Sequence, residues 1–582
     1  MKNLEIARIF YQIAEFIEMD EVSFRSRAYN KAARVLDSLE KDVQDIYQEG
    51  GTKALKEIPG IGEAIAKKIE EFIKTGHIKT YQRLKKQCPV DLETLTMVEG
   101  LGARKIKILY KELGIRNLKD LEKAAKTGKI LELEGFGEKS EKNILQAIQF
   151  VKAGQDRFLI GLILPIVRQI INQLKELPQV DKISIAGSAR RMNETIGDID
   201  ILIASNQPDK VINSFVKMPG IAKVWAKGPT KSSVRFRAGL ASPKQGEGGF
   251  DCDLRVVKKE SFGAALQYFT GSKDHNILIR KIAKKKGLKL NEYGVFKGKK
   301  KIAGKNEKEV YQAIGLSYIE PELRNNTGEI EAALANKLPK LINYSDIKGE
   351  IHSHSDWSDG SRTIKELALA AKKIGYQYLV ITDHTKGLTI ANGLDEARIL
   401  RQMKEIDQIN KSLRGIKILK GCEANIKVDG TIDIKDEVLA KLDIVLAGIH
   451  SKLKMNKKDM TKRIIRAIEN PHVDIIVHPT GRLINKRPGY QMDFEQVLKA
   501  AKKNKTALEI NAHTIRLDLR DFDIHQAVKA GVKMVIGSDI HSVNCFQMME
   551  LGIAQARRGW AEKKDILNTR TLTNFLKFFK DK

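Results

Sequence analysis

Residues 346–582 alternate short apolar segments with amphipathic segments of helical period. The seven apolar segments end near His354, His384, Glu423, His450, His478, Asn511 and Asp539. When strands alternate with helices, each helix returns the chain to the same edge of a sheet, so the strands pair in parallel. The spacing therefore predicts a barrel or a parallel α/β sheet, with the residues that end the strands gathered at one edge.

Histidine and carboxylate side chains concentrate at those strand ends. Of the 11 histidines, only His77 and His275 precede residue 346. The candidate ligands are His352, His354, Asp359, His384, Glu423, His450, His478, Asp539 and His541. Nitrogen and oxygen ligands without a thiolate suit Zn²⁺, Mn²⁺ or Fe²⁺, and clustered ions generate hydroxide and bind phosphate oxygens. We therefore predict a metal-dependent phosphoesterase site, whereas His472, His513 and His525 are predicted to be structural.

A second group of carboxylates lies in the middle of the chain. Asp198 and Asp200 alternate with isoleucines in a predicted strand and so share one face of it, and Asp253 lies in a later strand. Converging carboxylates repel one another unless a cation such as Mg²⁺ neutralises them. Ser188 and Arg191 lie on a glycine turn before the first strand, where they are suited to bind a triphosphate. If the two strands are neighbours, the pattern predicts nucleotidyl transfer with Mg²⁺ (or Mn²⁺).

Residues 1–150 are helical in pattern and contain three Gly-x-Gly turns. The glycines of these turns are Gly60, Gly62, Gly100, Gly102, Gly135 and Gly137. Backbone amides that follow such a turn can face a phosphate without reading the bases. One turn of this kind is more often an ordinary connection between helices. Three of them in a chain of formal net charge +30 favour binding to the DNA backbone.

The four cysteines are far apart in the sequence, so neither a disulfide framework nor a zinc knuckle is predicted. The first residues predict an amphipathic helix and not a signal peptide. The longest apolar run, residues 158–167, contains Pro165 and is too short to span a bilayer. We therefore expect a cytoplasmic monomer without a membrane partner.

Five short motifs lie between residues 187 and 293: GSARR, GDIDIL, DLR, YFTGS and LNEY. With these motifs, residues 1 to about 318 resemble the family X DNA polymerases, the group that contains polymerase beta. The resemblance implies that Asp198, Asp200 and Asp253 hold the metal ions and that Asp253 accepts the proton of the primer hydroxyl. The residues that it implies in nucleotide and template binding are Gly187, Ser188, Arg191, Gly197, Tyr268, Phe269, Gly271, Asn276 and Arg280. Lys273 departs from the acidic residue that family members often carry beneath the incoming base.

Residues 28–33 (AYNKAA) and the first glycine turn resemble the small lyase domain of that family. The resemblance places Lys68 at the lysine that forms a Schiff base and excises 5′-deoxyribose phosphate. Lys67 and other lysines crowd the same predicted helix, which favours an uncharged, nucleophilic amine. A second lysine of the family's pocket is Ala64 here, so a Lys68 that only binds phosphate is an equally weighted alternative.

The His-x-His pair and the segments ITDHT, GCEAN, AGIHS, IIVHPTGR and IGSDIHS resemble the PHP domain. That resemblance implies a distorted seven-stranded barrel with three Zn²⁺, Mn²⁺ or Fe²⁺ ions, in which all nine ligand positions named above are filled. It also implies that Arg482 and Arg516 bind substrate phosphates. Glu350 stands where an aspartate commonly precedes the pair, which affects metal tuning more than metal binding.

These patterns predict a helical and α/β protein of several domains. The predicted segments are 1–85 (lyase-like), 86–155 (helix-hairpin-helix), 156–260 (nucleotidyltransferase palm), 261–318 (nucleotide and template binding), 319–345 (linker) and 346–582 (PHP). The predicted function is a repair polymerase that fills gapped or nicked DNA from dNTPs and trims 3′ ends as a 3′–5′ exonuclease or phosphatase, with abasic-site cleavage as a further expectation. The alternatives are a PHP nuclease with a degenerate polymerase module that positions DNA, a non-enzymatic DNA-end scaffold, and a template-independent transferase.

Overall fold

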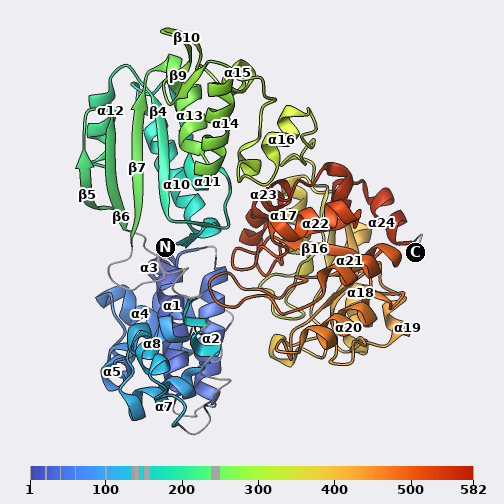
Figure 1. Cartoon of the computed structure of the whole chain (residues 1–582). Helices are drawn as coiled ribbons and strands as arrows, with labels where there is room; N and C mark the ends of the chain where they lie inside the picture. Colours follow the sequence, from blue (N-terminus) through green and yellow to red (C-terminus); the bar gives the residue numbers. More distant parts are fainter. Residues whose placement is uncertain are drawn as a thin grey trace. The chain divides into compact units, whose positions relative to one another are not determined.

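The computed structural model describes residues 2–580 apart from residues 20–22, 40, 59, 97, 99, 100, 134, 135, 137–142, 146, 150–156 and 238–248. The chain forms two compact units (Figure 1). One comprises Met1–Asp156 with Leu483–Pro488, and the other comprises Arg157–Arg482 with Gly489–Lys582. Among the described residues, none of the helices combines the length and hydrophobicity needed to cross a bilayer.

The first unit is built from helices. They are α1 (Lys2–Glu18), α2 (Ser23–Ser38), α3 (Val43–Lys56), α4 (Glu63–Thr75), α5 (Lys79–Gln87), α6 (Leu92–Thr96), α7 (Ala103–Leu113) and α8 (Leu118–Lys126). Phe10 and Phe72 belong to one buried core, and Ile106 belongs to a second. Helices α4 and α7 begin directly after Gly62 and Gly102, which are extended and supply no capping side chain. The first backbone amides of both helices therefore remain available to an outside acceptor.

The second unit opens with a five-stranded sheet of strand order β2-β4-β7-β6-β5 (Figure 1). Its strands are β2 (Lys182–Ile185), β4 (Asp198–Ala204), β5 (Ile221–Lys227), β6 (Lys231–Arg237) and β7 (Gly249–Val257). Strands β4 and β7 are parallel, and the other neighbours are antiparallel. Helices α10 (Ile160–Lys175) and α12 (Pro208–Phe215) bury Ile163 and Phe215 in the same core as Ile199 of β4. The short elements β1 (Phe158–Leu159), α11 (Gly187–Arg190) and β3 (Thr195–Ile196) flank this sheet.

The following residues form a further small core that contains Val295, Tyr311 and Ile330. Its elements are η2 (Lys259–Ser261), α13 (Phe262–Thr270), α14 (Lys273–Lys285), β8 (Lys289–Asn291), β9 (Gly294–Lys297), β10 (Lys300–Ala303), α15 (Glu307–Ala313), η3 (Pro321–Leu323) and α16 (Glu329–Leu334). The segment 319–345, predicted as a linker, is thus folded against this core. Its polar sequence concealed this because Arg324 is fully buried, where it forms an ion pair of 2.7 Å with Glu307.

Residues 349–537 contain seven parallel strands that are hydrogen-bonded in sequential order. They are β11 (Gly349–Glu350), β12 (Tyr378–Ile381), β13 (Lys417–Asn425), β14 (Ile444–Gly448), β15 (Ile475–Ile476), β16 (Ala507–Asn511) and β17 (Met534–Gly537). An isolated bridge between Ser353 and Ile540 joins the first strand region to the last. The predicted seven-stranded barrel is therefore confirmed as a nearly closed barrel.

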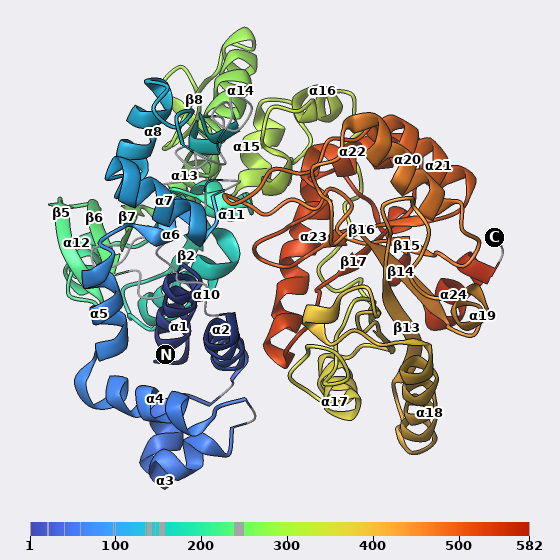
Figure 2. The same cartoon turned by 90° about the horizontal axis from the view of Figure 1, so that it is seen from below.

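Helices surround the barrel strands, as Figure 2 shows. They are α17 (Ile364–Ile374), η4 (Thr389–Ala391), α18 (Glu396–Ser412), α19 (Asp436–Leu439), α20 (Lys457–Ile468), α21 (Phe494–Lys503), α22 (Asp521–Ala530), η5 (Val543–Met548), α23 (Met549–Arg558), η6 (Lys563–Asp565), η7 (Leu567–Thr569) and α24 (Leu572–Lys580). Side chains alternate along β12, so that Tyr378 and Val380 share the inner core with Phe575 of α24. Leu379 and Ile381 join the outer core with the helices.

Candidate active sites

Three aspartates of the five-stranded sheet lie on two neighbouring strands. Strands β4 and β7 pair in parallel, with Asp198 opposite Asp251 and Asp200 opposite Asp253. Because residues two apart share a strand face, Asp198, Asp200 and Asp253 project from the same face, away from the core that holds Ile199. The structure therefore brings together the three carboxylates that the sequence singled out.

The three carboxylates repel one another. Burial of Asp200, together with the charges of Asp198 and Asp253, raises the pKa of Asp200 to about 7. Lys231 and Ser233 oppose this repulsion at Asp253: the Lys231 ammonium lies 3.0 Å from its carboxylate, and the Ser233 hydroxyl donates to it. A divalent cation would remove the repulsion more completely, so the donor set fits Mg²⁺.

Gly187 allows the turn of α11 to lie directly over Asp200. Its φ of +62° is in the left-handed region, and a Cβ atom at this position would lie 2.1 Å from Oδ2 of Asp200. Any larger residue would displace the carboxylate or the turn. The glycine therefore lets Ser188 and Arg191 stand beside the aspartates.

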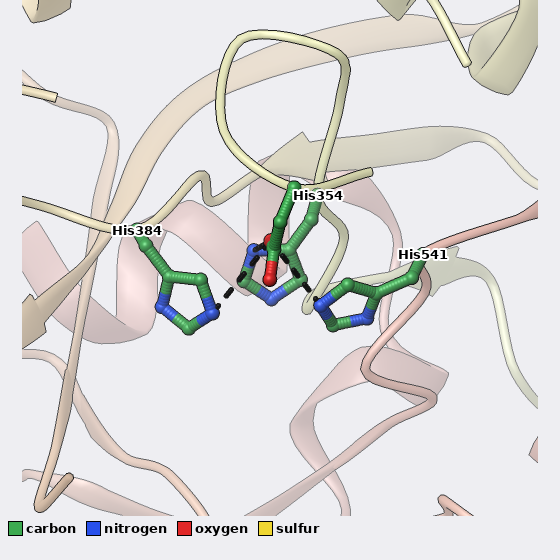
Figure 3. A group of neighbouring side chains, drawn as sticks. His354, His384 and His541 are labelled. Atoms are coloured by element: carbon green, nitrogen blue, oxygen red, sulfur yellow. Dashed lines mark ion pairs between the residues drawn. The ribbon is translucent and has the colours of Figure 1, made fainter. Parts of the chain in front are cut away.

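The second cluster lies at the carboxyl ends of the barrel strands. His352 and His354 follow β11, His384 follows β12, Glu423 lies within β13, His450 and His478 follow β14 and β15, and Asp539 and His541 follow β17. Three groups of potential ligand atoms lie within 4.8 Å: His354, Asp359, His384 and His541; His352, His354 and Asp539; and His384, Glu423 and His450. In Figure 3, the rings of His384 and His541 flank that of His354. His354 and His384 each belong to two groups, so neighbouring ions would share ligands.

Glu423 lies at the centre of the histidines. Its Oε1 is 3.0 Å from Nε2 of His450 and 2.9 Å from Nε2 of His478, while its Oε2 is 2.9 Å from Nδ1 of His384. The position of His478 beside Glu423 brings the ninth predicted residue to the cluster. A carboxylate with both oxygens directed at different histidines is suited to bridge two cations.

Several of these buried atoms have no hydrogen-bond partner. They are Nε2 of His352 and both ring nitrogens of His354. A buried polar atom without a partner costs about 1–3 kcal/mol. Orphaned ring nitrogens that converge at one place therefore fit transition-metal ions, which accept these lone pairs.

The pKa values of two histidines in this cluster are shifted in opposite directions. Burial and the neighbouring rings of His541 and His384 lower the pKa of His354 to about 3, so this ring is neutral and its lone pair is available. Burial also disfavours a charged His541, but Asp359 and Asp539 outweigh it and raise the pKa of His541 to about 10. A bound cation would displace the proton of His541 and take over its role in neutralising the carboxylates.

Comparison with known proteins bears on both sites. Over 584 residues, and 100% of both chains, the sequence is 40% identical to the DNA polymerase/3′-5′ exonuclease PolX of Bacillus subtilis (strain 168). The chain belongs to the family X DNA polymerases that carry a PHP domain. Residues 265–325 match the DNA polymerase beta thumb, residues 350–564 the PHP domain, residues 1–78 a helix-hairpin-helix domain, and residues 92–149 a SAM-like helix-hairpin-helix tandem.

Other relatives match one part of this family X polymerase. DNA polymerase lambda of Rattus norvegicus is 26% identical over 346 residues, which are 56% of each chain. A probable phosphatase of Caldanaerobacter subterraneus subsp. tengcongensis is 35% identical over 210 residues, which are 34% of this chain and 77% of the relative. The chain thus combines parts that occur apart in other proteins.

In this family X polymerase, α11 of the palm is joined to the thumb by a buried ion-pair network. The guanidinium of Arg190 donates to both carboxylate oxygens of Glu307, at 2.8 and 2.6 Å, and to the hydroxyl of Thr270 at 2.7 Å. Arg191 donates to the carbonyl of Thr270, and Arg324 donates to Oε1 of Glu307, the oxygen that one nitrogen of Arg190 also contacts. Arg190 and Glu307 were not predicted as site residues, because nothing in their spacing indicates a contact.

The predicted nucleotide and template residues of the thumb lie around the junction of α13 and α14. The rings of Tyr268 and Phe269 are nearly perpendicular at 5.2 Å. Asn276 accepts a hydrogen bond of 2.7 Å from Gln267 and donates one of 2.7 Å to the carbonyl of Tyr268. Arg280 is exposed and donates to the carbonyl of Asn276 at 3.1 Å. Asn276 thus links the exposed Arg280 of α14 to the aromatic end of α13.

The predicted lyase lysine and glycine turns lie in the first unit. Lys68 lies on α4 and is half-buried, and the neighbouring Lys67 forms an ion pair of 3.0 Å with Glu63. Gly60 has a φ of +91°, and Gly62 and Gly102 precede α4 and α7. The predictions at Gly100, Gly135 and Gly137 lie outside the described residues.

Two residues beyond the predicted ligands orient the PHP histidines. Oε1 of Glu509 lies 2.6 Å from Nδ1 of His352, and its Oε2 accepts the backbone amide of His478 at 2.7 Å. Asn425 contacts Nδ1 of His450 at 2.7 Å. Such partners fix the tautomer and direct the other ring nitrogen to the metal. The sequence feature that could have indicated Glu509 is a glutamate within the otherwise apolar strand β16, where the structure buries it completely.

Glu350, the departure from the PHP pattern, is also fully buried. It accepts the backbone amides of Ile351, His352 and Ser538. Burial raises its pKa to about 7, although these amides oppose the shift. It therefore holds the backbone of the first and last strands beside the cluster.

The two predicted phosphate-binding arginines differ in their surroundings. Nε of Arg516 lies 3.6 Å from Asp539, and this side chain is partly exposed at the cluster. Arg482 instead directs both terminal nitrogens at Glu194 of the palm, at 3.0 and 2.5 Å, and also donates to the carbonyl of Leu517. Of these two arginines, Arg516 is therefore the one that faces the predicted metal ligands.

Proposed function

We propose that the chain fills gaps in DNA by transferring nucleotides to a primer, with Asp198, Asp200 and Asp253 as the ligands of two Mg²⁺ (or Mn²⁺) ions. The observation that carries this proposal is the register of β4 and β7, which sets Asp200 opposite Asp253. The 40% identity over the full chain to a DNA polymerase/3′-5′ exonuclease supports it. When bound, the ions neutralise the triphosphate and lower the cost of ionising the primer hydroxyl.

The chain's own residues divide the remaining work. Asp253 accepts the proton of the primer 3′ hydroxyl. Ser188 and Arg191, on the turn that Gly187 permits, bind the triphosphate of the incoming dNTP, with Gly197 in the adjoining backbone. Tyr268, Phe269 and Gly271 border the sugar, and Asn276 and Arg280 face the nascent base pair and the template. Gly60, Gly62 and Gly102 bring helix N-termini to the DNA backbone.

The polymerase test uses Asp253→Asn and a matched neighbour, Asp251→Asn. Both residues lie on β7, but Asp251 pairs with Trp225 and Arg235 outside the cluster. Extension of a gapped duplex with Mg²⁺ and dNTPs is expected to fall at least about a hundredfold in the first variant and to change little in the second. Equal extension by wild type and Asp253→Asn would refute the proposal. Extension without a template strand would identify a transferase instead.

We also propose that the PHP domain removes nucleotides from 3′ ends with three Zn²⁺, Mn²⁺ or Fe²⁺ ions held by the nine residues predicted above. Support comes from the three ligand groups and from the orphaned buried ring nitrogens of His352 and His354. Arg516 binds the phosphate. His352→Ala is expected to lose Mn²⁺-dependent 3′–5′ degradation while it retains primer extension, and His472→Ala serves as the control. A hydrolase-only protein would show degradation without any dNTP incorporation.

For Lys68 we propose a role at a 5′-deoxyribose phosphate. Its position on α4 supports contact with a 5′ phosphate, with Schiff-base chemistry as the further step. Borohydride trapping on DNA with a 5′-deoxyribose phosphate is expected to label wild type and Lys67→Ala, and to spare Lys68→Ala. Absence of trapping in wild type would leave phosphate binding as its role.

The four free cysteines support a reducing, cytoplasmic compartment, and we propose a monomer.

A further inference from the structure

Residues 187–191 form the turn that carries Ser188 and Arg191, called here the nucleotide turn, and side chains of the PHP barrel contact the palm segment that follows it. Glu194 immediately precedes β3, and its two carboxylate oxygens lie 2.5 and 3.0 Å from the guanidinium of Arg482. Gln555 of α23 donates to the same carboxylate at 2.6 Å. The Arg482 side chain is only 10% exposed, so this bidentate pair is shielded from solvent and is stronger than a surface ion pair.

A second arginine of the barrel holds the same segment from another point. Arg558, at the end of α23, donates to the backbone carbonyl of Arg191 at 3.3 Å and to the side chain of Asn193. Its other terminal nitrogen pairs with Asp521 of α22. The guanidinium is therefore held by the barrel through one terminal nitrogen and contacts the palm through the other.

The segment between these two contacts is conformationally strained. Met192 has a φ of +51°, in a region that L-residues rarely adopt. Such a conformation persists only where its surroundings hold it. The contacts on Arg191, Asn193 and Glu194 surround Met192, so the barrel supplies part of this restraint.

From these contacts we infer that Arg482 and Arg558 are positioning residues of the polymerase site, through which the PHP barrel sets the affinity for the incoming dNTP. Residues 187–194 form one short segment, which contains Ser188 and Arg191 and ends at Glu194, the residue that Arg482 contacts. A shift of residues 192–194 would therefore move the side chains that bind the triphosphate. The inference rests on the nucleotide-binding role proposed above for Ser188 and Arg191.

The link also reaches the other site. Arg482 follows His478 by four residues in the loop after β15, and His478 lies against Glu423. The Arg482 guanidinium thus connects two sites. It lies in the loop that carries His478, one of the nine predicted PHP ligands (the hydrolytic cluster), and it contacts Glu194, which follows the nucleotide turn. The PHP barrel would therefore be a structural part of the polymerase site in addition to its own hydrolase role.

The test compares Glu194→Gln with a matched control at another contact between the same two parts. Arg168 of α10 and Glu550 of α23 form an ion pair of 2.5 Å whose side chains are more exposed and which does not touch residues 187–194. In gap filling by the full chain, Glu194→Gln is expected to raise the KM for dNTP about five- to tenfold with kcat changed less than about threefold. Arg168→Gln is expected to leave both within twofold.

A charge exchange separates positioning from simple loss of fold. Arg482→Glu and Glu194→Arg should each raise the KM for dNTP, and the double variant, which restores opposite charges across the same contact, should recover most of the loss. Thermal unfolding of each variant checks folding. The inference is overturned if Glu194→Gln and Arg168→Gln behave alike, or if the double variant is the sum of the two single ones. An inactive wild type would instead contradict the proposed polymerase function.

Discussion

The carboxylates of Asp200 and Asp253 stand side by side because β4 and β7 pair in parallel with these two residues opposite each other. The same register leaves Asp251 opposite Asp198, one pleat away and paired with Trp225 and Arg235. A strand slip of one residue would turn the entire set toward the core. The buried isoleucines of β4 therefore fix the geometry of the three aspartates.

Gly187→Ala tests the close approach of the nucleotide turn to Asp200. The added Cβ would meet Oδ2 of Asp200 at 2.1 Å, and the residue would also keep a φ of +62°. We expect a loss of about 1–3 kcal/mol in unfolding free energy, measured by urea titration, and at least about tenfold slower gap filling. Exonuclease activity should persist. A variant as stable and as active as wild type would show that the turn can move away freely.

Glu307→Gln tests the ion-pair network between palm and thumb through its pH dependence. Burial disfavours the charged form of Glu307, but Arg324 and Arg190 outweigh it and lower its pKa to about 2. A carboxylate with a lowered folded-state pKa adds stability above its unfolded pKa of about 4.5, and this stability is lost as the pH falls toward 2. The advantage over Glu307→Gln should therefore shrink by about 1 kcal/mol between pH 7 and pH 4.

Urea unfolding of both proteins across this range measures the difference. Exposed Glu331→Gln is the control, and its stability should track wild type at every pH. A gap between wild type and Glu307→Gln that stays constant from pH 7 to pH 4 would contradict the network as the source of the stability.

Glu423→Gln tests the shared carboxylate of the hydrolytic cluster. Its two oxygens face three histidines, and a neutral amide replaces one acceptor oxygen with a donor that cannot bind a cation. Elemental analysis should find at least one metal ion fewer per chain than in wild type, with 3′–5′ degradation lost. The exposed Glu437→Gln should keep the full complement. Equal metal contents in all three proteins would contradict a bridging role.

Glu509→Gln tests a residue that contacts the ligands without being one. Loss of the anionic partner of His352 should weaken metal affinity about 10–100-fold, because the ring loses both its orientation and its added basicity. Competition with a chelator measures this affinity, and Glu495→Gln on the surface is the control. If the variant resists the chelator as well as wild type does, the contact with His352 is structural only.

The sequence predicted the parts of both sites that follow from strand periodicity. Asp198 and Asp200 share a face because a strand has period two, and the nine PHP residues meet because parallel strands end at one edge. Glu509 was not predicted, since it lies within a strand and its role depends on which side chain stands opposite. The folding of residues 319–345 was hidden for a similar reason: the charge of buried Arg324 is neutralised by Glu307, which precedes that segment.

The bridge between Ser353 and Ile540 places the seam of the barrel at the hydrolytic cluster. His352 and His354 stand on one side of this seam and Asp539 on the other, although they form one ligand group. A cation held by this group would tie the first strand to the last, closing a loop that spans nearly the whole barrel, and long loops are the ones whose closure a cross-link helps most. The metal would thus cross-link the first and last strands in addition to its role in hydrolysis. Without metal, the barrel should open first between these two strands, so that their backbone amides exchange with solvent before those of the other strands.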